Sequence, residues 1–272
     1  MRPLFTALVG ASLATVTTEV RATPRPLPFT YNYDTNPEGE GEIETYVDLV
    51  PVKAADATGQ RRTALLSQFQ EEFEYGITNR LELGLYVTFA PTPSGFGGSS
   101  VVPSLTEGNG SKQRLRYRIS DSGVLPIDIG LYGEVTENEN EIELEAKVIL
   151  QRRFGKLYLA ANLVVEQESY FTGELSVVLD PSAGLWYQVT PVFQPGIEWW
   201  MYKELSNRAP PGGEFNLDAQ HYVGPTMLMN FGRVWWTTGA YARLTELHHD
   251  LNPNAGDSFG QLWFRTVIGV NL

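Results

Sequence analysis

The chain has 272 residues, no cysteine, 12% aromatic residues and a formal net charge of −12. This length suits one large all-β domain or two small ones. The acidic balance argues against nucleic-acid binding, because a nucleic-acid-binding domain needs a basic surface. Beyond the N-terminal stretch there is no run of about 20 apolar residues, so the sequence predicts no membrane-spanning helix.

Residues 1–22 are predicted to be a secretory signal peptide. Arg2 gives a basic start, residues 3–16 are mostly apolar, and Val20 and Ala22 fit a cleavage site after position 22. A buried N-terminal helix is the alternative. Cleavage near Ala22 would accompany export of the protein from the cytoplasm.

Residues 23–40 are rich in proline and polar residues, and they lack sustained alternation. We expect them to form an irregular periplasmic lead-in to one domain over residues 41–272. In that domain apolar and polar side chains alternate, as strands with one apolar face require. Most of the predicted strands are near the length of about 9–11 residues that a tilted membrane strand needs. The sequence predicts twelve: 41–50, 62–75, 81–90, 111–120, 125–136, 140–152, 156–166, 172–188, 193–203, 218–230, 234–244 and 259–271.

The connections between these strands alternate in length, so that one rim of the barrel would carry long connections and the other short turns. Two connections on the rim with long connections, 137–140 and 167–171, are exceptions, because they are short. Outer-membrane barrels have short periplasmic turns and longer external loops, and an even strand count places both termini on the short-turn side. The long connections are predicted at 51–61, 91–110, 203–217 and 245–258, and the short ones at 76–80, 120–124, 154–156, 189–192 and 231–233.

Alternation also fits a soluble sandwich, which turns its apolar face inward. Four features favour a membrane barrel instead: export without disulfides, unequal rims, aromatic residues near strand ends (among them Tyr75, Phe89, Trp235 and Trp263), and strands that continue to the last residue. The predicted fold class is all-β, a twelve-stranded antiparallel up-and-down transmembrane β-barrel in the outer membrane of a Gram-negative bacterium. Outer-membrane lipid, lipopolysaccharide and the barrel-assembly machinery are the expected partners.

The segment E-Y-G-I-T-N-R-L-E-L-G-L at Glu74–Leu85 resembles a hairpin common in proteobacterial outer-membrane barrels of the transporter type. It is most similar to the phenol-degradation MetA-type barrel family. The resemblance is strong over this hairpin and diffuse elsewhere, and it implies an outer-membrane transporter. The C-terminal Leu272 departs from the aromatic residue that ends many such barrels.

Charged residues on the polar strand faces are the candidate lumen or selectivity residues. Three arginines share one face of strand 111–120, and neighbouring strands offer Glu82, Asp128 and Glu134 to answer them. Two interpretations stay open: an ion-pair ladder that stiffens the barrel, or a charged constriction that selects a solute. The candidates are Arg114, Arg116, Arg118, Glu72, Glu74, Glu82, Asp128, Glu134, Glu143, Glu145, Lys147, Arg243 and Arg265.

The function expected is passive passage of a small solute through a charge-lined lumen. Tyr86, Tyr132, Tyr158 and Trp200 on the polar faces would suit an apolar or aromatic solute. The alternatives are a structural or adhesion barrel with a plugged lumen, and an outer-membrane enzyme acting on lipid. The enzyme is disfavoured because none of the histidines has the serine partner that a lipase needs. No catalytic residue, metal site or cofactor is predicted; the three histidines are His221, His248 and His249.

Overall fold

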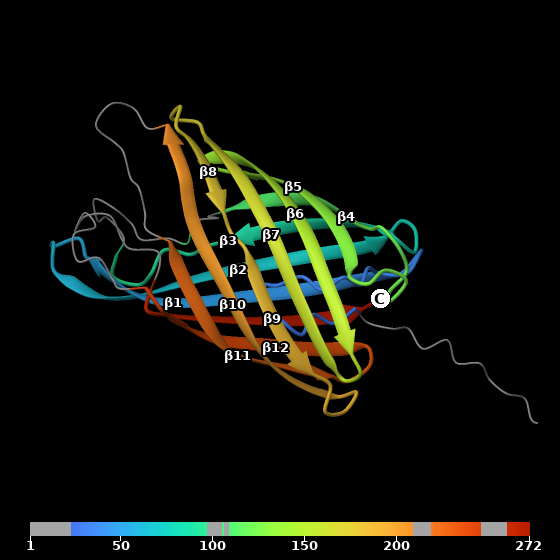
Figure 1. Ribbon diagram of the computed structural model, residues 1–272. Helices are drawn as coiled ribbons and strands as arrows, with labels where there is room; N and C mark the ends of the chain where they lie inside the picture. The colour runs from blue at the N-terminus through green and yellow to red at the C-terminus, as the bar shows by residue number, and fades with distance from the viewer. Residues whose placement is uncertain (1–22, 97–104, 106–108, 209–218, 246–259) are drawn as a thin grey trace, which may run out of the picture.

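The computed structural model describes residues 23–96, 105, 109–208, 219–245 and 260–272. Within these ranges no helix has the length and hydropathy that crossing a bilayer demands. The described residues form strands that surround a common interior (Figure 1). The strands are β1 (Gly41–Ala55), β2 (Arg61–Gly76), β3 (Leu81–Phe89), β4 (Gly110–Arg118), β5 (Asp128–Asn138), β6 (Glu141–Phe154), β7 (Leu157–Tyr170), β8 (Leu175–Leu179), β9 (Ser182–Tyr187), β10 (Phe193–Arg208), β11 (Gln220–Asn230), β12 (Val234–Arg243) and β13 (Leu262–Asn271).

The sheet closes on itself through antiparallel pairing of its first and last strands. The β1–β13 ladder runs from Glu42 opposite Asn271 to Leu49 opposite Phe264, and Leu272 N–H donates to Gly41 O. Apart from β8 and β9, which together take one strand position, each strand pairs with its neighbour in the chain, so the topology is up-and-down. Closure leaves no edge strand with unpaired backbone groups. The predicted twelve-stranded antiparallel barrel is confirmed.

One predicted strand, 172–188, is two segments in the structure. β8 pairs with the outer parts of β7 and β10, and β9 pairs with parts of the same two strands nearer the short turns. The interruption falls at Pro181, which has no N–H to donate to the ladder. Asp180 N–H still donates to Val164 O, and Pro181 O still accepts from Met201 N–H. The two segments therefore occupy one strand position in the barrel.

The longest hairpin replaces a predicted long loop. Residues 51–61 were expected to be a connection, but β1 continues to Ala55 and β2 begins at Arg61. Val50, Val52 and Ala54 keep the alternation through Pro51, and all three point inward. Near the same end, Phe96 and Leu105 from the β3–β4 connection are buried against this apolar interior.

The outer face of the barrel is apolar and the inner face is polar. In β3, Val87 is 60% exposed and Phe89 is 56% exposed, whereas Glu82 is fully buried and Tyr86 is 6% exposed. A water-soluble sheet has the opposite arrangement, with charges outside. Tyr75 and Phe89 point outward near strand ends as predicted, but Trp235 and Trp263 face the interior, so they do not belong to an outer aromatic girdle.

Most of residues 23–40 lie inside the barrel, and only the last few, around Glu38 and Gly39, are exposed. They form no strand, as predicted, but they do not simply lead in from the periplasm: Leu27 and Tyr33 are fully buried, and Arg25 is 2% exposed. The segment leaves the interior beside Gly76, where Gly39 N–H donates to Gly76 O. We refer to residues 23–40 as the inner segment. Both the start of β1 and the C-terminus lie at the short-turn end (Figure 1).

Candidate functional site: the charged interior of the barrel

A cluster of ion pairs lies on the inner faces of β2, β3 and β4. The Arg114 guanidinium is fully buried and contacts three carboxylates: Nη1 donates to Glu82 at 2.7 Å, Nε to Glu72 at 2.8 Å, and Nη2 to Glu74. Arg116 Nη2 lies 2.7 Å from Glu82. Buried charges need such partners, because each would otherwise lose its hydration without compensation.

The register of three strands explains why Arg114 reaches β2. Glu74, Gly84 and Arg114 stand opposite one another in one row across β2, β3 and β4. Gly84 has no side chain, so the Arg114 side chain folds over β3 to the β2 carboxylates. A Cβ at Gly84 would lie 2.6 Å from Arg114 Nε and 2.7 Å from Glu72 Oε1. The glycine is therefore a packing requirement of the cluster.

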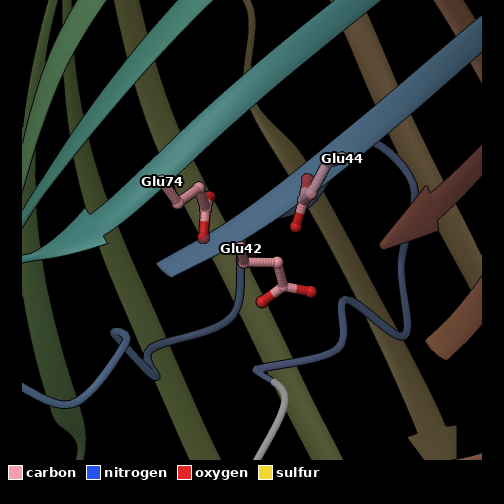
Figure 2. Close-up of side chains that lie close together, drawn as sticks. All are labelled: Glu42, Glu44 and Glu74. Atoms are coloured by element: carbon pink, nitrogen blue, oxygen red, sulfur yellow. The ribbon is translucent and has the colours of Figure 1, made fainter. Parts of the chain in front are cut away.

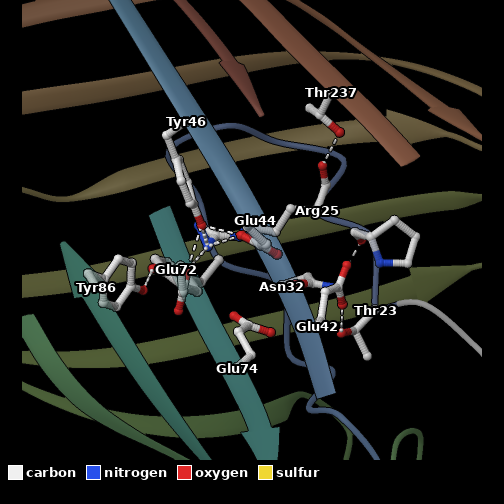
Figure 3. A network of polar contacts seen from close by, with 12 residues as sticks. Thr23, Arg25, Asn32, Glu42, Glu44, Tyr46, Glu72, Glu74, Tyr86 and Thr237 are labelled. Atoms are coloured by element: carbon white, nitrogen blue, oxygen red, sulfur yellow. Dashed lines mark hydrogen bonds and ion pairs between the residues drawn. The ribbon is translucent and has the colours of Figure 1, made fainter. Parts of the chain in front are cut away.

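Arg25 of the inner segment joins this cluster from the centre of the barrel. It donates to Glu44 at 3.0 Å, to Glu72 at 3.4 Å and to the Tyr46 hydroxyl, and its backbone oxygen accepts from Thr237 on β12 (Figure 3). Its guanidinium lies 3.8 Å from the ring centre of Tyr31. One residue thus links β1 and β2 to the far part of the wall.

The walls also satisfy the backbone of the inner segment. Glu198 on β10 accepts from the N–H groups of Phe29 and Thr30. Asn162 on β7 accepts from Tyr31 N–H at 2.6 Å and donates to Tyr31 O at 3.0 Å. Buried backbone amides need a partner, and an irregular segment finds none within itself.

Two further wall side chains complete this attachment. Gln151 on β6 accepts from Tyr33 N–H at 3.0 Å, and Glu82 accepts from Asn36 N–H at 2.6 Å. Contacts to β3, β6, β7, β10 and β12 place the segment across the lumen. The inner segment therefore crosses the interior of the barrel, and we refer to this level as the constriction.

A cavity of about 150 Å³ lies on the loop side of the constriction. Pro28, Phe29 and Tyr31 of the inner segment form one boundary, and side chains of the wall form the rest. We call this space the vestibule. Its wall is mostly acidic along β5, β6 and β7 and at Asp180, and aromatic rings line another part of it. Lys112 lies 3.6 Å from Glu134, and Lys147 lies 2.8 Å from Glu145.

The sequence-predicted lumen residues divide into separate groups. Glu72, Glu74, Glu82, Arg114 and Arg116 form the ion-pair cluster just described. The vestibule takes Glu134, Glu143, Glu145, Lys147 and Arg265.

Asp128, Arg118 and Arg243 lie apart from both groups. Asp128 was expected to answer the arginines of β4. It instead accepts from Ser122 Oγ and Gly123 N–H, which fixes the β4–β5 turn. Arg118 donates to Asn79 O in the β2–β3 turn. Arg243, 7% exposed, lies 3.5 Å from Thr245 O.

Several interior residues were not among the predicted lumen residues. Asp48 pairs with the predicted Arg265 at 2.8 Å, and it shares the inner face of β1 with Glu42 and Glu44. The alternation of 41–50 carried the signal for these acids, because all three fall on its polar face. No comparable signal marks Arg25, because the inner segment has no periodicity that assigns its side chains to a face.

The carboxylates of Glu42, Glu44 and Glu74 approach one another closely (Figure 2), with oxygen atoms within 4.8 Å. Each already has a partner. Glu42 accepts from Trp235 Nε1 and Thr23 Oγ1, while Arg25 pairs with Glu44 and Arg114 with Glu74. The arrangement is explained by these partners without a bound ion.

Neither a protein-family model nor a curated protein matches the chain. Solved structures do share its fold. The COG4313 outer membrane channel from Pseudomonas putida F1 is 14% identical, with a TM-score of 0.59 over 89% of this chain and 98% of that one. The NanC porin is 8% identical, with a TM-score of 0.56 over 85% of this chain and 100% of that one. The fold is that of outer-membrane β-barrels.

A KdgM porin in complex with disordered oligogalacturonate is also similar. It is 8% identical, with a TM-score of 0.50 over 85% of this chain and 99% of that one. At such identities these likenesses concern architecture alone. The role of this barrel must be argued from its own interior.

Proposed function

We propose that the protein is an outer-membrane channel or facilitator for a small solute in a Gram-negative bacterium. The observation that carries this is a charge-lined vestibule inside a closed barrel whose outer face is apolar. The apolar outer face can contact the hydrocarbon of a bilayer, and the polar interior can hold water. The three fold neighbours named above are channels and porins by description, which supports a non-enzymatic role.

The proposed surroundings follow from the same outer surface. Outer-membrane lipid and lipopolysaccharide would contact the apolar belt, and the barrel-assembly machinery would insert the exported chain. The predicted signal peptide, residues 1–22, lies outside the described residues, as do His248 and His249. His221 is described, and its ring stacks on Trp199 with 5.8 Å between centres.

We further propose that the protein is a relative of the phenol-degradation MetA-type barrels and that its solute is apolar or aromatic. The hairpin Glu74–Leu85 supports kinship with the phenol-degradation MetA-type barrels. Tyr86, Tyr132 and Trp200 are buried in the interior, and Tyr158 is half-buried. Their rings support an apolar or aromatic solute, because flat apolar groups stack on aromatic side chains.

Single-channel conductance of the purified full chain in a planar bilayer tests the channel directly. We expect small, steady steps, because the inner segment narrows the path. Heat-modifiable migration on gels would show that the same preparation is folded. Silence from a folded barrel over the whole voltage range would overturn the proposal.

A plugged structural or adhesion barrel is the second candidate. The many hydrogen bonds between the inner segment and the wall favour it, because they hold the segment across the lumen. A variant that lacks residues 24–35 separates the two candidates. A channel should conduct in the wild type and conduct more in the variant, whereas a plugged barrel should conduct only in the variant.

A further inference from the structure

The vestibule wall holds an excess of carboxylates. Seven carboxylate side chains and four cationic ones line it. On β6 and β7, Glu143 stands directly opposite Glu168, and Glu145 directly opposite Glu166. Like charges directly opposite one another on neighbouring strands destabilise a sheet. Two such pairs in succession are a cost that the fold alone does not explain.

The four cations that line the vestibule all have partners. Arg25 is bound to Glu44 and Arg265 to Asp48, two carboxylates outside the vestibule. Lys112 and Lys147 pair with the vestibule carboxylates Glu134 and Glu145. By contrast, Glu166 lines the vestibule together with the carboxylates of Glu143, Asp180, Glu145 and Glu168.

A second, independent observation comes from Glu141. Its side chain lines the vestibule, and the residue is 5% exposed. Oε1 accepts from Asn138, but Oε2 has no hydrogen-bond partner among the described residues. Leaving a buried carboxylate oxygen unsatisfied costs free energy. The same holds for Trp200 Nε1, a buried donor without a partner in the described part of the chain.

The aromatic part of the vestibule completes a recognition surface. Phe29 stacks on Trp200 with 4.6 Å between ring centres, and Trp263 meets Trp200 edge-on at 5.1 Å. Aromatic faces attract cations. Lys147 Nζ shows this within the protein, because it lies 4.4 Å from the Tyr31 ring centre and 4.3 Å from that of Tyr132.

We infer that the vestibule binds a small organic cation, an ammonium group attached to a flat apolar body. The ammonium would lie against the carboxylates of β6 and β7, and the apolar body against the aromatic side chains that line the cavity. The volume of about 150 Å³ matches a cavity that holds a benzene ring. This inference rests on the proposed function and names the class of solute.

A bare metal ion fits the vestibule less well. Glu134, Glu143 and Glu145 place oxygen atoms within 4.8 Å of one another, but Lys112 and Lys147 already pair with two of these carboxylates. A metal ion would also leave the aromatic rings without a role. The combination of acids and rings favours an organic cation.

The test is a calorimetric titration, in which benzylamine is added to the purified full chain in detergent. Benzylamine is cationic at pH 7. Benzyl alcohol is the matched uncharged probe. The variant Glu166→Gln/Glu168→Gln removes two wall charges, and Glu137→Gln removes one on the exposed outer side of β5. Because the double variant relieves repulsion between carboxylates, it should fold, and heat-modifiable migration checks this.

We expect saturable benzylamine binding that weakens at least tenfold in the double variant and is unchanged in Glu137→Gln. Benzyl alcohol should bind at least tenfold more weakly than benzylamine. Equal binding of the two probes, or an unchanged affinity in the folded double variant, would overturn the inference. Calcium binding without benzylamine binding would overturn it as well.

Conductance recorded on the same preparation separates this inference from the channel proposal. If the barrel conducts but does not bind benzylamine, it is a channel for another class of solute, and only the inference fails. If the barrel does not conduct but binds benzylamine as expected, the inferred binding site stands and the channel proposal fails.

Discussion

The two halves of the interior differ in what their carboxylates face. Near the short turns, Arg114 is surrounded by Glu72, Glu74 and Glu82, and Arg25 of the inner segment answers Glu44. In the vestibule, Glu166 and Glu168 face other carboxylates across the β6–β7 ladder. A cluster in which each carboxylate contacts an arginine stabilises the fold, whereas carboxylates that face one another form the cation-binding site that we propose.

Removing the central cation should have the largest effect. Arg114→Met leaves three buried carboxylates without their common partner, and breaking a buried ion pair costs about 3–5 kcal/mol. We expect a large fall in the urea midpoint of unfolding, or failure to fold. Arg152→Met, which changes an exposed arginine on β6, is the control. Similar midpoints for the two variants would show that the three carboxylates do not need Arg114 as their partner.

Next in size is the effect of inserting a methyl group into the cluster. Gly84→Ala places a Cβ 2.6 Å from Arg114 Nε, so the side chain must shift. Overpacking of this kind costs about 1–3 kcal/mol. Gly133→Ala on β5 is matched, because no atom lies within 4 Å of its Cβ position. Denaturant unfolding should separate the two; equal stability would show that Arg114 has room to spare.

Loosening the inner segment should alter conductance more than stability. Asn162→Ala removes both hydrogen bonds to Tyr31. With the segment less firmly held at this point, we expect larger or noisier current steps in a planar bilayer. Gln113→Ala, on the exposed side of β4, supplies the comparison. Identical traces would mean that the segment does not set the width of the path.

The smallest effect expected is on ion selectivity. Neutralising the vestibule wall with Glu166→Gln/Glu168→Gln should shift the reversal potential in a salt gradient towards weaker cation preference. Rings of charge act on ions in this way. The outward-facing Glu137→Gln should leave the potential where it is. A null shift for both variants would assign the wall acids a role other than filtering ions.

Strand alternation allowed the sequence to predict which side chains face inward. Glu72, Glu82 and Arg114 were assigned to the lumen because each sits on the polar face of a strand, and the pleat determines the rest. The number of barrel strands followed from the same pattern. Pro181 was the local exception, since a residue without N–H interrupts a ladder and leaves the alternation intact.

The constriction could not be predicted in the same way. The partners of the inner segment are single side chains, such as Glu198, Asn162 and Gln151, that lie on strands far along the chain. No period in residues 23–40 encodes those contacts. Asp128 failed for a related reason: its position on the polar face was right, but a nearby turn with free N–H groups offered it closer donors than any arginine.

The bond from Thr237 to Arg25 joins residues 212 positions apart in the chain. Contacts of such long range form slowly, because much chain entropy is lost before they are made. The complete set of inner-segment contacts requires β12 to be in place, so it can form only after nearly the whole sheet has assembled. The seating of the inner segment is then a late step in the folding of this barrel, and the interior is wider before that step than after it.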